Sequence, residues 1–338
     1  MLNILTNLRP EAYPSGFEIF GQEIRFYAII ILGGAILCAI YAFLRFAKPM
    51  GMSNDTVLEG LALGLFFGIL GGRIYYVIFN HEGIDNIWEA LNPRGGGLAI
   101  HGAIIATALF VTIYCKIKKM DLIKLCEIVV PTFLMCQVIG RWGNFMNQEA
   151  FGPLVNGYTS GPLTDLELLA QRETLRHLLV PNFVIDNMYI TPDYSLDIPK
   201  ITGYYYPTFF FESVLNLIGA VGYIILRKKS NKIYLGDAVA FYLTWYGLVR
   251  FIIESMRTDP LMIGNIRIAL LTSAIFFVVG ILIFILRRVF KFKCESAREL
   301  LYEGGTIWLD PNKDPFKEKE EAKQLLKEKK INKQKEKE

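Results

Sequence analysis

Long stretches of apolar residues constrain the fold of this chain more than any other feature of its sequence. Residues 26–44, 95–115 and 268–286 each run for about 20 residues without an acidic residue, a lysine or an arginine, which is enough for a helix to cross a bilayer. Hydrophobic residues make up 53% of the 338 residues, a share that favours a membrane protein over a soluble domain. Four further apolar stretches contain charged residues, namely 57–79, 122–141, 209–226 and 236–254. We therefore expect an all-α polytopic membrane protein with seven transmembrane helices.

Lysine and arginine are distributed unevenly among the connections between these stretches. The first, third and fifth connections and the segment after residue 286 contain most of them, whereas the second and sixth contain few. Because positively charged loops stay in the cytoplasm, we expect the N-terminus outside and the C-terminus inside. The long segment at about 153–206, between helices four and five, is then a small external head. Within it, the sequence predicts a helix at 162–179 and short strands at 183–190 and 201–206.

The sequence predicts two parts, a seven-helix transmembrane domain over residues 1–290 and a charged cytoplasmic tail over residues 291–338. The tail is rich in lysine and glutamate after residue 314 and has few apolar residues, a composition that cannot form a core of its own. The five cysteines form no visible disulfide framework, and the three histidines are far apart in the sequence, so we expect no metal site. We also expect no cofactor and no nucleic-acid partner.

Polar side chains are rare within the apolar stretches, and the orientation places most of them toward the outer side of the membrane. Charged groups at membrane depth are costly and face a bundle interior or a water-filled cavity. Polar groups with separate structural roles would not be expected to lie at one common depth in the membrane. We therefore interpret these residues as one polar cavity that opens toward the outer leaflet. They come from different spans and comprise Tyr27, Arg73, His101, Arg141, Asn144, Glu212, Tyr246, Arg250 and Glu254.

The densest polar cluster is residues 140–152, which contain Arg141, Asn144 and Glu149 at the end of the fourth stretch. An interfacial anchor is the alternative interpretation, since arginine and tryptophan often lie at headgroup depth. Three glycines in the same run, the last of them Gly152, favour a binding site, because glycine lets the backbone approach a ligand closely.

Tyr246, Arg250 and Glu254 are spaced so that they share one face of a helix. The acid can orient the arginine, and the arginine can hold an anion, for which a lipid phosphate is the natural candidate at this depth. An internal ion pair that only stabilises the bundle is the alternative. His101 is a candidate general base near neutral pH or, alternatively, a hydrogen-bonded structural histidine.

Together these segments resemble the prolipoprotein diacylglyceryl transferase family. Residues 140–152 match its signature, Gly-Arg-x-Gly-Asn-Phe-x-Asn-x-Glu-x-x-Gly, at every fixed position. The resemblance covers roughly residues 13–288 in order. It includes 25–27, 71–73, 101–102, 207–212 and 246–257. One departure is Tyr206, which stands where the family usually has histidine before its Pro-Thr or Pro-Ser pair.

The resemblance implies a transferase of the bacterial plasma membrane. The diacylglyceryl group of phosphatidylglycerol would pass to the lipobox cysteine thiol in the signal peptide of a prolipoprotein, forming a thioether and releasing glycerol phosphate. This is the first step of bacterial lipoprotein maturation. The implied partners are phosphatidylglycerol, these signal peptides and membrane lipid.

The implied reaction assigns roles to the polar residues of the cavity. Arg141 and Arg250 would hold the phosphate of the leaving group. A thiol with a pKa of about 8.5 is mostly protonated at neutral pH, so a base is needed, and His101 and Tyr246 both remain candidates. The expected catalytic residues are therefore His101, Tyr246 and Arg250. The expected phosphatidylglycerol-binding residues are Arg141, Asn144, Tyr27, Arg73, Glu149, Gly152 and Glu254.

Two other functions also explain a cluster of cations within a membrane. A transporter or channel for an anion or lipid would place polar groups in both halves of the bilayer, whereas the inner halves of these spans are largely apolar. A seven-helix sensor with a lipid-binding pocket would not require a base beside a phosphate site. The resemblance favours the enzyme over both.

Overall fold

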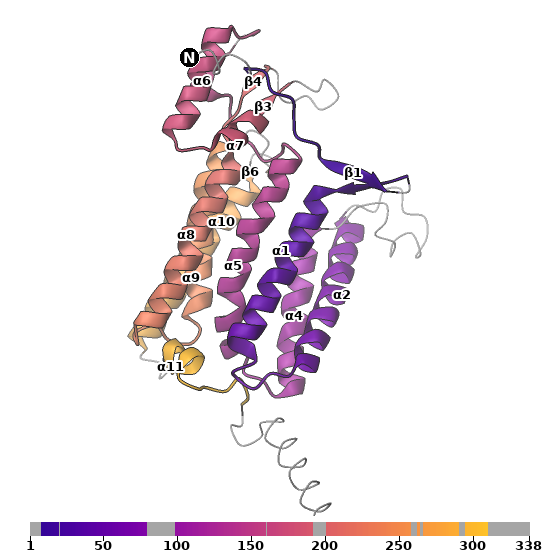
Figure 1. Cartoon of the computed structure of the whole chain (residues 1–338). Helices are drawn as coiled ribbons and strands as arrows, with labels where there is room; N and C mark the ends of the chain where they lie inside the picture. The colour runs from indigo at the N-terminus through magenta and orange to yellow at the C-terminus, as the bar shows by residue number, and fades with distance from the viewer. Residues whose placement is uncertain are drawn as a thin grey trace, which may run out of the picture. The chain divides into compact units, whose positions relative to one another are not determined.

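The computed structural model describes residues 8–19, 21–79, 99–159, 161–191, 201–257, 262–263, 266–290 and 295–309. This part of the chain is mostly helical (Figure 1). Six of its helical segments are long and apolar enough to cross a membrane, which supports the expected polytopic membrane protein. They are Phe26–Ala47, Asn54–Phe79, His101–Lys118, Leu122–Met146, Thr208–Lys229 and Ile268–Val289.

Over the residues that the structure describes, each expected apolar stretch corresponds to one long helix; residues 95–98 of the stretch 95–115 lie outside them. Several helices extend beyond the apolar residues, because polar residues at a helix end can still form the backbone hydrogen bonds of the helix. The helix at the sixth expected span is comparably long but contains Arg250 and Glu254 and falls outside the group of six. The helices are α1 (Phe26–Ala42, continued by the π-helix Phe43–Ala47), α2 (Asn54–Phe79), α4 (Ile100–Lys118), α5 (Leu122–Met146), α8 (Thr208–Lys229), α9 (Asp237–Met256) and α10 (Ile268–Val289).

The chain divides into two compact units. Unit 1 comprises Met1–Ile40, Val129–Ser230 and Asp237–Cys294, and it contains most of α1 and α5 together with all of α8, α9 and α10. Within it, α9 packs against both α8 and α10 (Figure 1). A side chain at Gly280 would place its Cβ 2.4 Å from Oγ1 of Thr244, so α9 and α10 approach as closely as small residues allow.

Unit 2 comprises Tyr41–Ile128, Asn231–Gly236 and Glu295–Glu338. Its main contact joins α2 to α4, where a Cβ on Gly71 would lie 2.1 Å from Cβ of Ala106. The described part of the expected tail, residues 295–309, is folded here and contains the short helix α11 (Ala297–Tyr302). After α11, the Ile307 N–H donates to the Met50 carbonyl and the Ile307 carbonyl accepts from Asp121 N–H. Residues 310–338 lie outside the described part.

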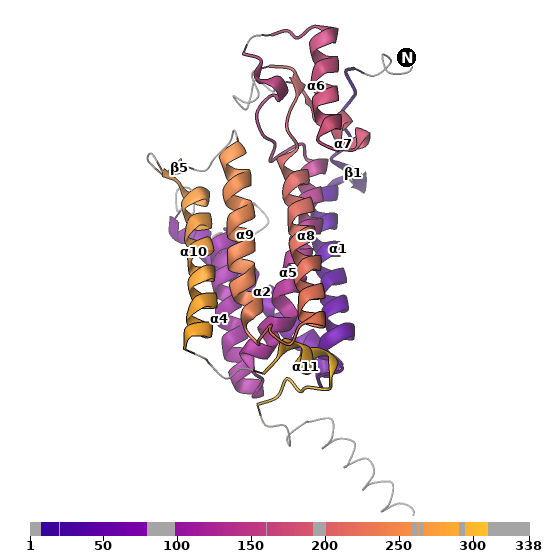
Figure 2. The ribbon, with the colours of Figure 1, turned by 90° about the vertical axis from the view of Figure 1, so that its left-hand side faces the viewer.

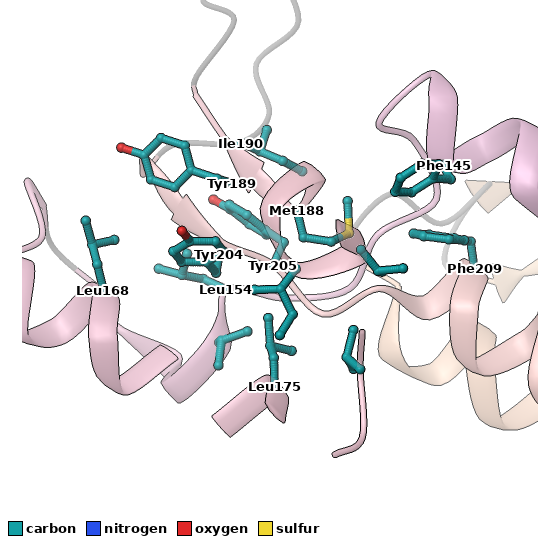
Figure 3. Packing of buried hydrophobic residues seen from close by; sticks show 14 of the residues in the cluster. Phe145, Leu154, Leu168, Leu175, Met188, Tyr189, Ile190, Tyr204, Tyr205 and Phe209 are labelled. Carbon is teal, nitrogen blue, oxygen red and sulfur yellow. The ribbon is translucent and has the colours of Figure 1, made fainter. Parts of the chain in front are cut away.

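The head belongs to unit 1. Its longest helix, α6 (Asp165–His177), begins with a capping box in which Thr164 and Glu167 bond each other's backbone N–H groups. Figure 3 shows its apolar core, in which Leu175 of α6 lies with Met188 and Tyr204. The other elements are a 3-10 turn (Val155–Gly157), α7 (Asn182–Asn187) and the antiparallel strands β3 (Tyr189–Ile190) and β4 (Gly203–Tyr204). Two further hairpins pair β1 (Gly16–Ile19) with β2 (Gln22–Arg25), and β5 (Met262–Ile263) with β6 (Ile266–Arg267).

The expected strand at 183–190 is mostly wrong, because residues 182–187 form α7. Val184 and Ile185 are both fully buried, and two successive side chains cannot face the same side of a strand. A helical turn resolves this conflict, and the Pro181 carbonyl accepts hydrogen bonds from both their N–H groups. The predicted helix at 162–179 is confirmed as α6.

Candidate functional site

A buried carboxylate on α8 lies at the centre of the polar cluster in unit 1. The side chain of Glu212 is 2% exposed. Its Oε1 accepts a hydrogen bond from Nη2 of Arg141 on α5 at 2.6 Å, and its Oε2 accepts one from Nη1 of Arg250 on α9 at 3.2 Å. Nη2 of Arg250 in turn lies 2.7 Å from Oε2 of Glu254. Three helices are thus linked by four charges of alternating sign.

The two arginines are held in place yet keep hydrogen-bonding capacity. Nη1 of Arg141 donates to Oδ1 of Asn144 at 3.3 Å, in addition to its contact with Glu212. A guanidinium has five N–H donors in a fixed plane, so neither arginine is saturated by these contacts. The Arg141 and Arg250 side chains are 21% and 15% exposed. They are therefore oriented by acids and still able to bind an anion.

The helix that carries Glu212 begins directly after the chain leaves the head. Pro207 precedes the first residue of α8, a position where its fixed φ suits a helix start. The hydroxyl of Thr208 donates to the Ala150 carbonyl. One turn further, the hydroxyl of Ser213 donates to the Val138 carbonyl at 3.0 Å. These two bonds fix α8 to α5 and its following loop on either side of Glu212.

The loop after α5 presents Glu149 in a strained turn. Oε1 of Glu149 accepts from Nδ2 of Asn144 at 3.1 Å and from Nδ2 of Asn147 at 3.3 Å. Its two neighbours, Gln148 and Ala150, have φ of 50° and 56°. Residues other than glycine rarely adopt such a backbone, and strain of this kind clusters at functional sites.

The far end of this loop is bonded to the backbone of Tyr206. The Gly152 N–H donates to the Tyr206 carbonyl at 2.8 Å, and the Tyr206 N–H donates to the Pro153 carbonyl at 3.1 Å. A Cβ on Gly152 would lie 3.0 Å from Cγ2 of Thr208 and 3.1 Å from Cβ of Tyr206. Tyr206, which stands where the family usually has histidine, therefore holds this loop through its backbone groups. A tyrosine provides these groups as well as a histidine does.

Two tyrosines complete the cluster. A Cβ on Gly143 would lie 2.9 Å from Cδ2 of Tyr27, so the Tyr27 ring of α1 lies directly on α5 beside the signature residues. On α9, Tyr246 interacts electrostatically with Glu212, Arg141 and Arg250. Its ring is stacked at 5.4 Å on that of Tyr242, one turn away.

Tyr242 is held from α5. Its hydroxyl accepts a hydrogen bond from Nε2 of Gln137 at 3.0 Å. Because Tyr242 supports the ring of Tyr246, this bond fixes the orientation of a predicted catalytic residue.

Unit 1 thus brings together most of the predicted site, namely Tyr27, Arg141, Asn144, Glu149, Gly152, Tyr246, Arg250 and Glu254. Arg73 and His101 lie in unit 2, on α2 and α4. The guanidinium of Arg73 lies 5.5 Å from the centre of the Tyr76 ring. The imidazole of His101 is stacked at 6.2 Å on Tyr75. Their roles stay predictions. No group of metal-ligating side chains occurs among the described residues.

Comparison with known proteins identifies the family. A family model described as prolipoprotein diacylglyceryl transferase matches residues 14–286. The phosphatidylglycerol–prolipoprotein diacylglyceryl transferase of Staphylococcus xylosus is 36% identical over 306 residues, which cover 88% of this chain and 96% of that protein. A relative from Clostridium perfringens is 36% identical over 273 residues, covering 81% and 94%, and one from Enterococcus faecalis is 36% identical over 274 residues, covering 80% and 89%.

The chain belongs to the prolipoprotein diacylglyceryl transferase family. The resemblance expected from the signature is confirmed. The match to residues 14–286 includes every predicted site residue, so the cluster in unit 1 lies wholly within the part of the chain that this family shares.

From the sequence, Glu212 was placed in the polar cavity but was given no role in catalysis or binding. The structure makes it the link between the two arginines. A signal was present, because Glu212 is the only acid in an otherwise apolar stretch, one turn after Pro207 and Thr208. Asn187 was also missed. It is fully buried, its Nδ2 donates to the Phe145 carbonyl at 2.6 Å, and its carbonyl accepts from Gln148. No pattern in the sequence marks it.

Proposed function

We propose that this protein transfers the diacylglyceryl group of phosphatidylglycerol to the thiol of a lipobox cysteine in prolipoprotein signal peptides. The observation that carries the proposal is the pair of arginines, Arg141 and Arg250, held by the buried Glu212 in a chain of this family. Phosphatidylglycerol and prolipoprotein are named as the substrates of the relatives.

In this reaction the thiol sulfur attacks the glyceryl carbon that carries the phosphate ester. A carbon–sulfur bond forms, the carbon–oxygen bond to the phosphate breaks, and glycerol phosphate leaves with the electron pair. The thiol proton passes to a base. Arg141 and Arg250 stabilise the negative charge that gathers on the leaving oxygen, and Asn144 and Glu149 shape the space for the headgroup. Tyr246 and His101 both stay candidates for the base.

We further propose seven transmembrane helices, with α9 as the sixth. Two of its three charged residues, Arg250 and Glu254, lie in the cluster with Glu212 rather than on a surface turned to lipid, and the third, Asp237, is its first residue. The lysine and arginine distribution supports a head that lies outside the cell, a cytoplasmic C-terminus and a charged tail after the transmembrane domain of residues 1–290.

The orientation can be tested by thiol labelling. Thr159 is an exposed head residue, whereas Cys294 lies outside the described residues. In intact cells, an impermeant thiol reagent should label a Thr159→Cys variant and leave Cys294 unlabelled. Strong labelling of Cys294 without labelling at position 159 would overturn this topology.

The activity is tested by incubating purified protein with phosphatidylglycerol and a lipobox peptide and then measuring the mass of the peptide. The peptide should gain one diacylglyceryl group, and a peptide with serine in place of cysteine should gain none. Arg141→Ala or Arg250→Ala should lower the rate about a hundredfold or more. Lysine at either position should rescue poorly, because it keeps the charge without the two-pronged donor geometry.

Arg9→Ala is the matched control for these variants. Arg9 forms a 2.6 Å ion pair with Asp165, in which both side chains are more than half exposed, so its loss should leave the rate unchanged. Absence of any mass change with wild-type protein, folded by thermal melting in detergent, would refute the proposed function.

A further inference from the structure

The end of α6 exposes apolar side chains that the head does not need for its own core. Leu178 and Leu179 are 47% and 85% exposed, and Phe183, just inside α7, is 46% exposed. Val180 between them is buried, so the turn itself is packed and only its outer side is open. Single exposed leucines are ordinary, but three large apolar residues on one short turn need an explanation. Leu178, Leu179 and Phe183 are called the apolar turn below.

Leu179 also has an unusual backbone conformation. Its φ is 60°, in the left-handed region. The Val180 N–H donates to the Leu175 carbonyl at 3.1 Å and the Leu179 N–H to the Arg176 carbonyl. This is the hydrogen-bonded end of a helix at which glycine or asparagine is the usual residue. A leucine there is unfavourable for the backbone, and its side chain is not buried within the head.

The apolar turn is continuous with the surface of the membrane-spanning helices. Phe183 is stacked at 6.0 Å on Trp142 of α5, and Trp142 also contacts Phe210 of α8 at 6.3 Å. Further along the same side of α8, Val214 and Ile218 are 38% and 56% exposed, at the spacing of successive helical turns. An apolar surface therefore runs from the α8 span through Trp142 to the head. In Figure 2, α7 lies beside the first turns of α8.

The charges around the turn suit a lipid surface. Arg176 and His177 directly precede the two leucines, and Arg176 also pairs with Glu173 at 2.5 Å. Between Glu173 and Asp186 the sequence contains no acid. Basic side chains beside apolar ones are typical of segments at the level of lipid headgroups, where the phosphates are anionic and the acyl chains begin.

We propose that the apolar turn inserts into the leaflet on the head's side of the membrane and anchors the head to the bilayer. The occupant of the exposed apolar surface is the acyl-chain region of phospholipid, with Arg176 and His177 at the phosphates. Burial of Leu179 in lipid compensates for its unfavourable backbone. This inference depends on the protein's place in a membrane and not on the proposed enzymatic activity.

Leu166 provides a matched control within the same helix. It lies near the start of α6 and is 78% exposed, nearly as open as Leu179. The two residues lie 13 positions apart, and a helix rises about 1.5 Å per residue. Leu166 should therefore lie in water if only the end of α6 reaches the membrane.

The test places a nitroxide label at position 179 or 166 in full-length protein whose native cysteines are replaced, reconstituted in vesicles containing phosphatidylglycerol. Collision rates are measured with oxygen, which concentrates in the bilayer, and with a water-soluble nickel chelate. The label at 179 should collide mainly with oxygen and the label at 166 mainly with the chelate. A label at 179 as open to the chelate as that at 166 would overturn the proposal. Shielding of position 179 from both reagents would also overturn it, in favour of a protein partner.

A second measurement uses the unmodified protein, so that a label cannot distort the turn. Photoactivatable groups on the acyl chains of the lipid should cross-link to the peptide that contains residues 178–183 and not to the peptide that contains Leu166. The absence of any cross-link at 178–183, with cross-links present on α8, would likewise refute the anchor.

Discussion

Replacement of Glu212 by glutamine is the sharpest test of the arginine arrangement. Glu212→Gln keeps the size of the side chain and removes its charge. Arg250 retains Glu254 at 2.7 Å, whereas the hydrogen bonds described above leave Arg141 with the neutral Asn144 at 3.3 Å. One end of the glutamine is also an amide donor, which cannot accept a hydrogen bond from either guanidinium. Arg141 should therefore be the residue that moves.

The structure sets the size of the effect. Glu212 makes two hydrogen bonds to charged groups, each worth about 1.5–3 kcal/mol, and loss of one partner from a buried ion pair costs about 3–5 kcal/mol. A displacement of about 1 Å in a positioning group can reduce a rate about a hundredfold. We expect Glu212→Gln to lower the thermal melting temperature and to reduce diacylglyceryl transfer at least a hundredfold.

The assay must separate lost stability from lost positioning. Glu127, fully buried in unit 2, accepts a hydrogen bond from the Gly236 N–H. Glu127→Gln removes another buried carboxylate and should reduce stability without a comparable loss of rate in the folded fraction. If Glu212 acts through Arg141, the double variant Arg141→Ala with Glu212→Gln should be about as slow as Arg141→Ala alone. Fully additive losses, or a Glu212→Gln enzyme within threefold of wild type, would refute the reasoning.

Three further predictions concern other parts of the chain. Gly143→Ala should displace the Tyr27 ring, 2.9 Å from the new Cβ, and reduce transfer in a protein that still melts cooperatively; an unchanged rate would argue against a role for Tyr27. Removal of residues 315–338 should change activity less than about tenfold, since the sequence of this segment is rich in lysine and glutamate and has few apolar residues. A larger loss at equal expression would reveal a functional element. Burial raises the pKa of Tyr204 above its ordinary value. The stability that the protonated Tyr204 side chain gives the head is therefore complete below pH about 10 and is lost as the pH rises through the raised pKa. Alkaline melting of wild type and Tyr204→Phe checks this, and the variant should lack that pH dependence.

The helices could be predicted from the sequence because the bilayer imposes one simple requirement. About 20 apolar residues must cross the hydrocarbon with every backbone group bonded internally, and each expected apolar stretch corresponds to a helix. The head carries no such constraint. The β-branched side chains of Val184 and Ile185 favour a strand, and their burial in the tertiary core of the head places them in a helix instead (Figure 3).

The site could be predicted in part for a related reason. Arg141 and Arg250 were visible because charges are rare in apolar stretches. The sequence did not show which acid pairs with which arginine, because the i, i+4 spacing on α9 suggests only the Arg250–Glu254 contact. The bridge from Glu212 to both arginines depends on how α8 lies against α5 and α9. That arrangement is fixed by bonds such as Ser213 to the Val138 carbonyl, which leave no periodic pattern in the sequence.

The alternating order Arg141, Glu212, Arg250, Glu254 has a consequence for the proposed reaction. Two positive and two negative groups sum to zero, so the cluster can be buried before substrate arrives without an uncompensated charge. The phosphate diester adds one negative charge, and the transfer converts it to a monoester that can bind one more proton. The thiol supplies one proton. If that proton ends on the glycerol phosphate, the charge inside the site is the same before and after the reaction. The base then needs to hold the proton only while the carbon–sulfur bond forms, and a site with balanced charges is suited to this exchange because no step leaves a new net charge in a medium of low dielectric constant.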